Sequence, residues 1–240
     1  MDPWTFGCLV AIVVVASSLQ GSIGFGAGMV AAPAIALVAP ELLPALVVMF
    51  ACLLTLMVTI RERAHLDLAG AGWALLGRLP GSVIGAFMVV VLPVTALSWV
   101  VAVSVLAGTG SAFLGWRPAP TRGVLVTAGA LSGIMGTSTS VGGAPMAIVW
   151  QGQEPARTRG TMSAFFLVGS IVSVVMLALV GAVTWYAVHV FLGLIPAVAV
   201  GFLLSRRLNH WMNTERLRVC GLILATGGGV LLAIRLLVGI

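Results

Sequence analysis

Long apolar stretches separated by short polar loops dominate the hydropathy pattern of the chain. A helix that crosses a bilayer needs about 20 mostly apolar residues. Uninterrupted stretches of about this length predict six membrane-crossing helices, at residues 43–60, 68–92, 94–115, 160–181, 184–205 and 222–238. Two longer stretches, 4–39 and 123–150, contain several helix-breaking residues. Each of these two is predicted to be a broken element.

Glycines and a proline interrupt the first broken stretch and recur in the second. Segment 20–34 reads QGSIGFGAGMVAAPA, and segment 132–146 reads SGIMGTSTSVGGAPM. Glycine costs roughly 1 kcal/mol relative to alanine inside a helix, so neither segment is expected to be smoothly helical. The two segments match at a constant offset of 112 residues, which pairs Gly21 with Gly133, Gly24 with Gly136, and Pro33 with Pro145. Broken apolar segments at corresponding positions are the best sequence indication of a transporter's binding site.

The repeat continues outside the broken segments. Pro80 and Gly85 correspond to Pro196 and Gly201, with the offset now 116. The predicted fold is an all-α polytopic membrane protein with a single membrane domain, 1–240. It consists of two repeats, 1–119 and 120–240, each formed by one broken element and three crossing helices.

The positions of the arginines indicate how the broken elements enter the membrane. If each broken element crossed once, the loop arginines would be divided between the two sides. If each is instead a re-entrant hairpin of two half-helices, ten arginines share one side: Arg61, Arg63, Arg117, Arg122, Arg157, Arg159, Arg206, Arg207, Arg216 and Arg218. The positive-inside rule makes that side cytoplasmic and places both termini outside. Three crossings per half then give an inverted repeat, with hairpins that enter from opposite faces and tips that meet near the bilayer middle.

Composition supports a membrane protein and excludes other classes. Hydrophobic residues make up 60% of the chain and charged residues 8%, against about a quarter charged in a soluble domain. The net charge of +6 does not indicate nucleic-acid binding, because the arginines lie in short loops that set topology. We expect a multi-pass protein of the inner (cytoplasmic) membrane, in contact with the lipid bilayer. Asp2 in place of a positive N-terminal region argues against a cleaved signal peptide.

No cofactor or metal is expected. Cys8, Cys52 and Cys220 are far apart and lie in apolar stretches without a C-x-x-C motif, so neither a zinc site nor a disulfide framework is predicted. No nucleophile with a neighbouring base is visible either, which makes a membrane-embedded enzyme the least favoured class. The sequence leaves open whether the chain forms a homodimer.

The tips of the two hairpins are the predicted substrate site. A half-helix that begins at a tip presents unpaired N–H groups and the positive end of its dipole, which favour an anion. The predicted site residues in the two tips are Gln20, Gly21, Ser22, Gly24, Gly26, Gly136, Thr137, Ser138, Thr139, Ser140 and Gly142. The alternative is tight helix packing, which also uses small residues in membranes.

Two ionisable residues within the predicted spans are further candidates. Arg78 lies about ten residues into its span, on the order of 15 Å deep, and its repeat counterpart is Leu194. An arginine at that depth is costly and suggests recognition of an oxyanion by its fork of N–H donors. The alternative is an arginine that neutralises backbone carbonyls. His189, near the outer end of its span, is either a proton carrier or a packed interfacial residue. No acid lies deep in a span, so a carboxylate proton relay is not expected.

The duplicated G-x-x-G…P segments, Gly21–Pro33 and Gly133–Pro145, resemble those of the sulfite exporter TauE/SafE-like family of membrane transporters. GTSTSVGGAP at 136–145 and the basic loop that leads into Phe165 and Phe166 also fit, and the resemblance covers essentially the whole chain. It implies transport of sulfite, a sulfonate such as sulfoacetate, or another organosulfur or organic anion. The predicted function is secondary transport of such an anion by alternating access. An anion channel, or a uniporter without ion coupling, is the alternative.

Overall fold

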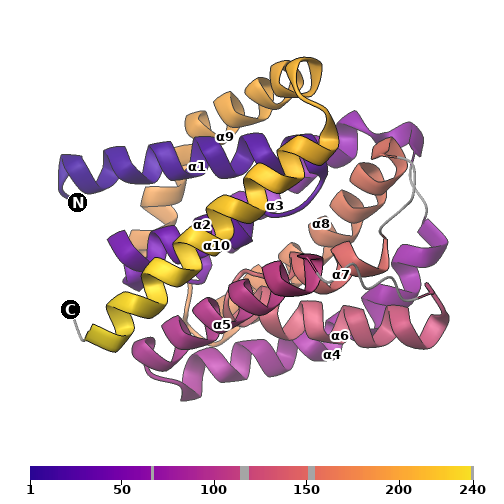
Figure 1. Cartoon of the computed structure of the whole chain (residues 1–240). Coiled ribbons are helices and arrows are strands. Elements are labelled where there is room, and N and C mark those ends of the chain that lie inside the picture. Colours follow the sequence, from indigo (N-terminus) through magenta and orange to yellow (C-terminus); the bar gives the residue numbers. More distant parts are fainter. Residues whose placement is uncertain (66–67, 114–118, 151–154, 239–240) are drawn as a thin grey trace.

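The computed structural model describes residues 1–65, 68–113, 119–150 and 155–238, and every regular element among them is helical (Figure 1). The first half contains α1 (Pro3–Ile23), α2 (Ala27–Val38), η1 (Pro40–Leu42), α3 (Ala45–Arg61), η2 (Arg63–His65), α4 (Leu68–Val91) and α5 (Val94–Phe113). The second half contains α6 (Arg122–Ser138), α7 (Gly143–Val149), α8 (Pro155–Leu179), α9 (Trp185–Trp211) and α10 (Thr214–Val238). The predicted all-helical class is confirmed.

Six of the described helices are long and apolar enough to cross a membrane: α1, α4, α5, α8, α9 and α10. This set differs in one member from the predicted set. The stretch at 43–60 forms α3, which has 17 residues and extends only about 26 Å. Conversely, the first arm of the broken element at 4–39 is predicted to be a half-helix. This is wrong, because α1 has 21 residues and is long enough to cross a membrane. It continues through Gly21 because this glycine lets α9 approach closely: a Cβ at Gly21 would lie 2.7 Å from Ser205 Oγ.

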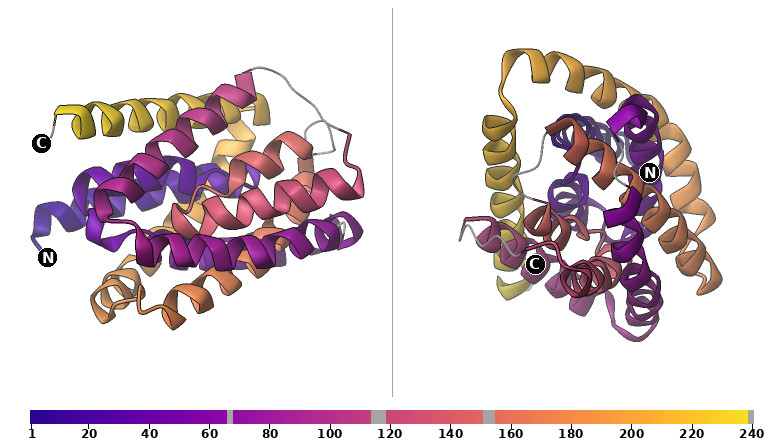
Figure 2. Two further views of the ribbon diagram at one scale, coloured as in Figure 1. Left: turned by 90° about the horizontal axis from the view of Figure 1, so that it is seen from below. Right: turned by 90° about the vertical axis from the view of Figure 1, so that its right-hand side faces the viewer.

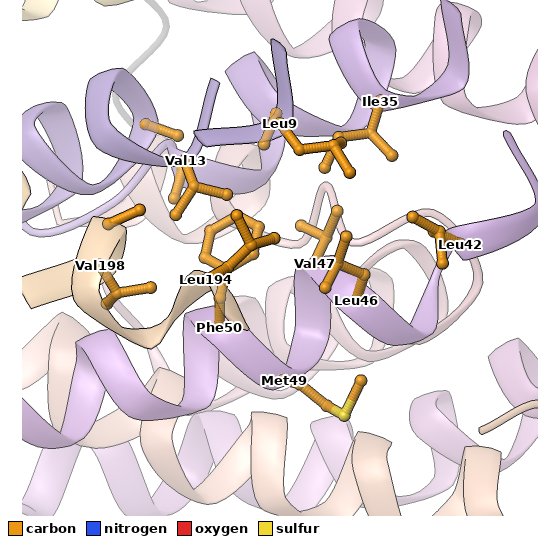
Figure 3. Packing of buried hydrophobic residues seen from close by; sticks show 14 of the residues in the cluster. Leu9, Val13, Ile35, Leu42, Leu46, Val47, Met49, Phe50, Leu194 and Val198 are labelled. Atoms are coloured by element: carbon orange, nitrogen blue, oxygen red, sulfur yellow. The ribbon is translucent and has the colours of Figure 1, made fainter. Parts of the chain in front are cut away.

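The first broken element reverses direction at residues 24–26. Gly24 and Gly26 have φ of 92° and 102°, a left-handed conformation that glycine adopts without steric cost. The chain then returns as α2 along α1, so that Leu9 and Ile35 meet in one apolar cluster (Figure 3). The start of α1 and the end of α10 lie at the same end of the molecule (Figures 1 and 2).

The second broken element reverses direction at residues 139–142, between α6 and α7. Ser132 Oγ of α6 donates a hydrogen bond to the Gly142 carbonyl (2.7 Å), which holds the start of α7 against α6. The first turn of α2 touches the second reversal directly. A Cβ at Gly28 would lie 1.8 Å from the Ser140 carbonyl oxygen, so only glycine allows this contact between the hairpins.

Helix pairs that glycines bring close together link the two halves. At the interface of α4 and α6, a Cβ at Gly77 would lie 1.9 Å from Val126 O, and one at Gly81 would lie 2.3 Å from Ala130 O. On the opposite side of the molecule α1 packs against α9, where a Cβ at Gly201 would lie 2.6 Å from Val14 O (Figure 1). Close packing through small residues is typical of membrane helices. The first helix of each hairpin therefore packs against a helix of the other half, while the inverted symmetry of the repeats stays a prediction.

Apolar side chains from α1, α2, α3 and α9 fill the largest core cluster (Figure 3). Leu194 of α9, the repeat counterpart of Arg78, is fully buried in this cluster. Large apolar side chains on α4, α8, α9 and α10 are instead exposed at the surface, for example Phe87, Ile171, Leu203 and Ile234. An apolar outer surface is what a lipid environment requires of these helices.

Candidate functional site

A cavity of about 50 Å³ lies where the two hairpin reversals meet. This is several times the space that one water molecule needs. Its walls come from both hairpins and from α3, α4 and α8, through Gln20, Gly26, Gly28, Met29, Val48, Ala51, Thr55, Arg78, Gly136, Ser140, Gly142, Gly143, Phe166 and Ser170. The cavity therefore joins residues from both halves of the chain.

Arg78 supplies the positive charge of the cavity wall, although its side chain is almost entirely buried (4% exposed). Its Nη1 donates to Ser132 Oγ (2.6 Å) and to the Ser132 carbonyl (3.1 Å). Among the described residues its Nε has no hydrogen-bond partner, and no Asp or Glu forms an ion pair with it. An arginine has five N–H donors, and the described residues accept hydrogen bonds only from Nη1, so they leave the Nη2 and Nε donors unused.

Small and aromatic residues make room for the guanidinium. Gly169 of α8 lies directly against it, since a Cβ there would be 1.6 Å from Arg78 Nε. Gly136 lies on another side, where a Cβ would be 3.0 Å from Nη2. The rings of Phe165 and Phe166 lie 5.1 and 5.6 Å from Cζ, within range of cation–π attraction. Nη2 thus lies beside Gly136, a residue of the cavity wall.

Six of the residues predicted from the sequence line this cavity: Gln20, Gly26, Arg78, Gly136, Ser140 and Gly142. Gln20 Oε1 accepts a hydrogen bond from Ala27 N (3.0 Å), the first residue of α2. This bond uses one of the N–H groups that the helix end offers and involves only the oxygen of the Gln20 side-chain amide. Ser140 Oγ donates to the Pro44 carbonyl (3.1 Å).

The other predicted tip residues have partners elsewhere. Ser22 Oγ donates to the Ser18 carbonyl (2.8 Å), and Thr137 Oγ1 lies 2.7 Å from Ser173 Oγ. The hydroxyls of Ser138 and Thr139 donate back to carbonyls of their own helix. Gly21 packs against α9 and Gly24 against α8. Of the four consecutive hydroxyl residues, only Ser140 reaches the cavity.

His189 lies away from the cavity. Its side chain is exposed on α9, and its Nδ1 is 2.7 Å from the carbonyl of Trp185, which is itself 79% exposed. Among the described residues no group of three His, Cys, Asp or Glu side chains is placed to hold a metal ion.

Sequence reasoning missed three polar residues of the site, Thr55, Ser132 and Ser170. Thr55 and Ser170 line the cavity, and Ser132 connects Arg78 to Gly142. Each is a single hydroxyl in an apolar stretch, and such a hydroxyl commonly bonds to its own helix, as Thr55 Oγ1 does to the Ala51 carbonyl. Ser132 could have been found from the repeat, because the offset of 112 pairs it with Gln20, whereas the sequence carries no signal that separates Thr55 and Ser170 from other hydroxyls.

Together, the helical fold and the cavity between two broken helices define a multi-pass membrane protein of the transporter class. The family model described as sulfite exporter TauE/SafE matches residues 9–232 of the chain. The chain therefore belongs to the TauE/SafE sulfite exporter family of membrane transporters. Comparisons with curated proteins and with solved structures gave no significant match.

Proposed function

We propose that this protein is a secondary transporter that moves sulfite, a sulfonate or another small organosulfur or organic anion across the membrane by alternating access. The cavity between the hairpin reversals is the substrate site. Arg78 binds the anion through Nη2, while Gln20 and the backbone of the two reversals complete the surroundings of the ligand.

The burial of Arg78 carries this proposal. A charge that is removed from water is costly unless it is paired, and the described residues offer this arginine no carboxylate. Two aromatic rings and one serine compensate only part of that cost. An oxyanion in the cavity would supply the missing partner and would satisfy donors that the described residues leave unused.

The position of the cavity supports alternating access. Arg78 on α4 belongs to the first half of the chain, whereas Ser132, which orients it, belongs to the second. The two hairpins contact each other through backbone at Gly28 and Ser140, and Met29 packs in one apolar cluster with Val141 and Ala144. Because the walls of the cavity come from both halves, a movement of one hairpin against the other would change access to it.

The limited size of the cavity and the family favour a small oxyanion. A volume of about 50 Å³ fits a compact ion better than an extended molecule, and the matched family is named for sulfite export. Arg78 contributes a planar fork of donors, which matches the oxygens of sulfite or a sulfonate.

A thermal-shift screen of the purified protein against sulfite, sulfonates, thiosulfate and carboxylates tests the proposal. A ligand that binds the folded state raises its apparent stability. Arg78→Gln should abolish the shift, and Arg78→Lys should weaken it, because lysine keeps the charge but loses the fork. Arg216→Gln, an exposed arginine on α10, is the matched control and should behave like the unmodified protein. Unchanged affinity in Arg78→Gln would remove Arg78 from the site, and flux that does not saturate in proteoliposomes would indicate a channel.

A further inference from the structure

A second group of arginines lies beside the first hairpin reversal, away from Arg78. Glu62, which is 8% exposed, accepts hydrogen bonds at Oε1 from Arg61 Nε (3.1 Å) and from Arg159 Nε (3.3 Å). The side chains of these two arginines are only 15% and 17% exposed. The protein thus already holds one oxyanion, a carboxylate, between two guanidinium groups in a largely buried position.

This arginine cluster also holds the hairpin in place. Arg61 Nη2 donates to the Gly21 carbonyl, and its Nη1 donates to Ser205 Oγ (3.1 Å). Gly24 packs against Arg159, since a Cβ there would lie 2.7 Å from the Arg159 Cα. Gln20, the neighbour of Gly21, lines the central cavity. One short segment of chain therefore contacts both the cavity and the arginine cluster.

The cluster carries more positive charge than Glu62 can neutralise. Arg61 and Arg206 both lie over the ring of Phe202, with Cζ at 4.9 and 6.0 Å from its centroid. Arg206, which is exposed, thus brings a third positive charge to the side of Arg61. Within the described part of the chain, Glu62 is the only polar partner of the Arg159 guanidinium. Among the described residues, these three arginines and one acid leave an excess of positive charge and of hydrogen-bond donors for another anion.

We propose that Arg61, Arg159 and Arg206 form a second binding site for the transported oxyanion, next to the first hairpin reversal, and that the Glu62 carboxylate fills this site until an anion displaces it. The inference rests on the proposed function, because the same anion is the ligand of the central cavity. Carboxylates, sulfite and sulfonates offer guanidinium groups the same kind of paired oxygen acceptors. Because Arg61 also binds the Gly21 carbonyl, an anion that draws Arg61 away would loosen the hairpin.

Titration calorimetry with sulfite on the purified full chain tests the site. Glu62→Gln keeps the shape and one acceptor oxygen of the side chain but removes the competing charge. It should expose a second sulfite-binding event, or strengthen a weak one by at least about tenfold, as expected for one charge-assisted hydrogen bond. Glu62→Gln combined with Arg159→Gln should lose this event again. A folded Glu62→Gln protein with unchanged sulfite binding would overturn the inference.

Further variants separate this site from the central one. In Glu62→Gln combined with Arg78→Gln, the second event should remain while the central one disappears. If instead Arg78→Gln alone leaves central binding intact, the proposed function fails. The second site is then still tested by whether Arg159→Gln removes the binding event seen in Glu62→Gln. Should Glu62→Gln fail to fold, Arg159→Gln in proteoliposomes should raise the KM for sulfite severalfold from the arginine-loop face while kcat changes little. An unchanged KM would refute the site, and Arg216→Gln serves again as the control.

Discussion

Gly169 offers a direct test of the role of Arg78, because it is the residue against which the guanidinium packs. A Cβ at Gly169 would lie 1.6 Å from Nε, 2.4 Å from Cζ and 2.5 Å from Cδ of Arg78. These three nearest atoms all belong to one flexible side chain and none to a neighbouring backbone. Gly169→Ala should therefore leave the helices in place and force Arg78 out of its position at the cavity wall.

The expected loss follows from the hydrogen bond between Arg78 and the anion. A hydrogen bond to a charged group contributes about 1.5–3 kcal/mol, and 1.4 kcal/mol corresponds to a factor of ten in Kd. Gly169→Ala should thus weaken sulfite binding by about 10- to 150-fold, as measured by titration calorimetry in detergent. Its melting temperature without ligand should stay close to that of the unmodified protein.

A control variant and a second background separate the displacement of Arg78 from a general effect of an added methyl group. Gly110→Ala on α5 is the matched control, since no atom lies within 4 Å of a Cβ there, and it should bind sulfite normally. In an Arg78→Ala background, Gly169→Ala should cost nothing further, because the side chain that it displaces is already absent. Wild-type affinity in the single variant, or an equal loss in both backgrounds, would refute the role assigned to Gly169.

Other parts of the fold can be tested in the same way. Gly77→Ala places a Cβ 1.9 Å from Val126 O, a backbone atom that has no room to move, so we expect a destabilisation of about 1–3 kcal/mol or more and a lower melting temperature. Gly72→Ala on the same helix meets no atom within 4 Å and should be neutral or stabilising; equal behaviour of the two variants would contradict the packing of α4 on α6. For the predicted orientation, a membrane-impermeant maleimide on intact cells should label Glu41→Cys but not His210→Cys in a cysteine-free background. The reverse pattern would invert the topology.

Much of this fold could be predicted from the sequence, because its main signals are local. The lengths of the apolar stretches reveal the long helices, since a helix must satisfy its own backbone in lipid. Glycine clusters mark the two reversals, and the left-handed conformations of Gly24 and Gly26 agree with that interpretation. The full length of α1 was not predicted. Glycine has a low helix propensity, but the close packing of Gly21 against Ser205 offsets this cost, and that contact is not visible in the sequence.

The candidate site was predicted only in part. The depth of Arg78 in its span was visible in the sequence, and so were the tip residues Gln20 and Ser140, which do line the cavity. Thr137 Oγ1, however, bonds to Ser173 Oγ, which itself donates to the Gly169 carbonyl. This contact joins two distant segments, and no spacing rule predicts it.

The sequence by itself thus determined the class of protein, the positions of the chain reversals and one buried positive charge, because hydrophobic length, glycine content and charge are properties of single segments. Only the tertiary structure decided which donors remain free. Arg78 donates from Nη1 to Ser132 and packs against Gly169. Arg61 and Arg159 both donate to the Glu62 carboxylate. These hydrogen bonds and contacts join side chains from separate helices. They are set by the distances between the helices, which exist only after the helices have packed.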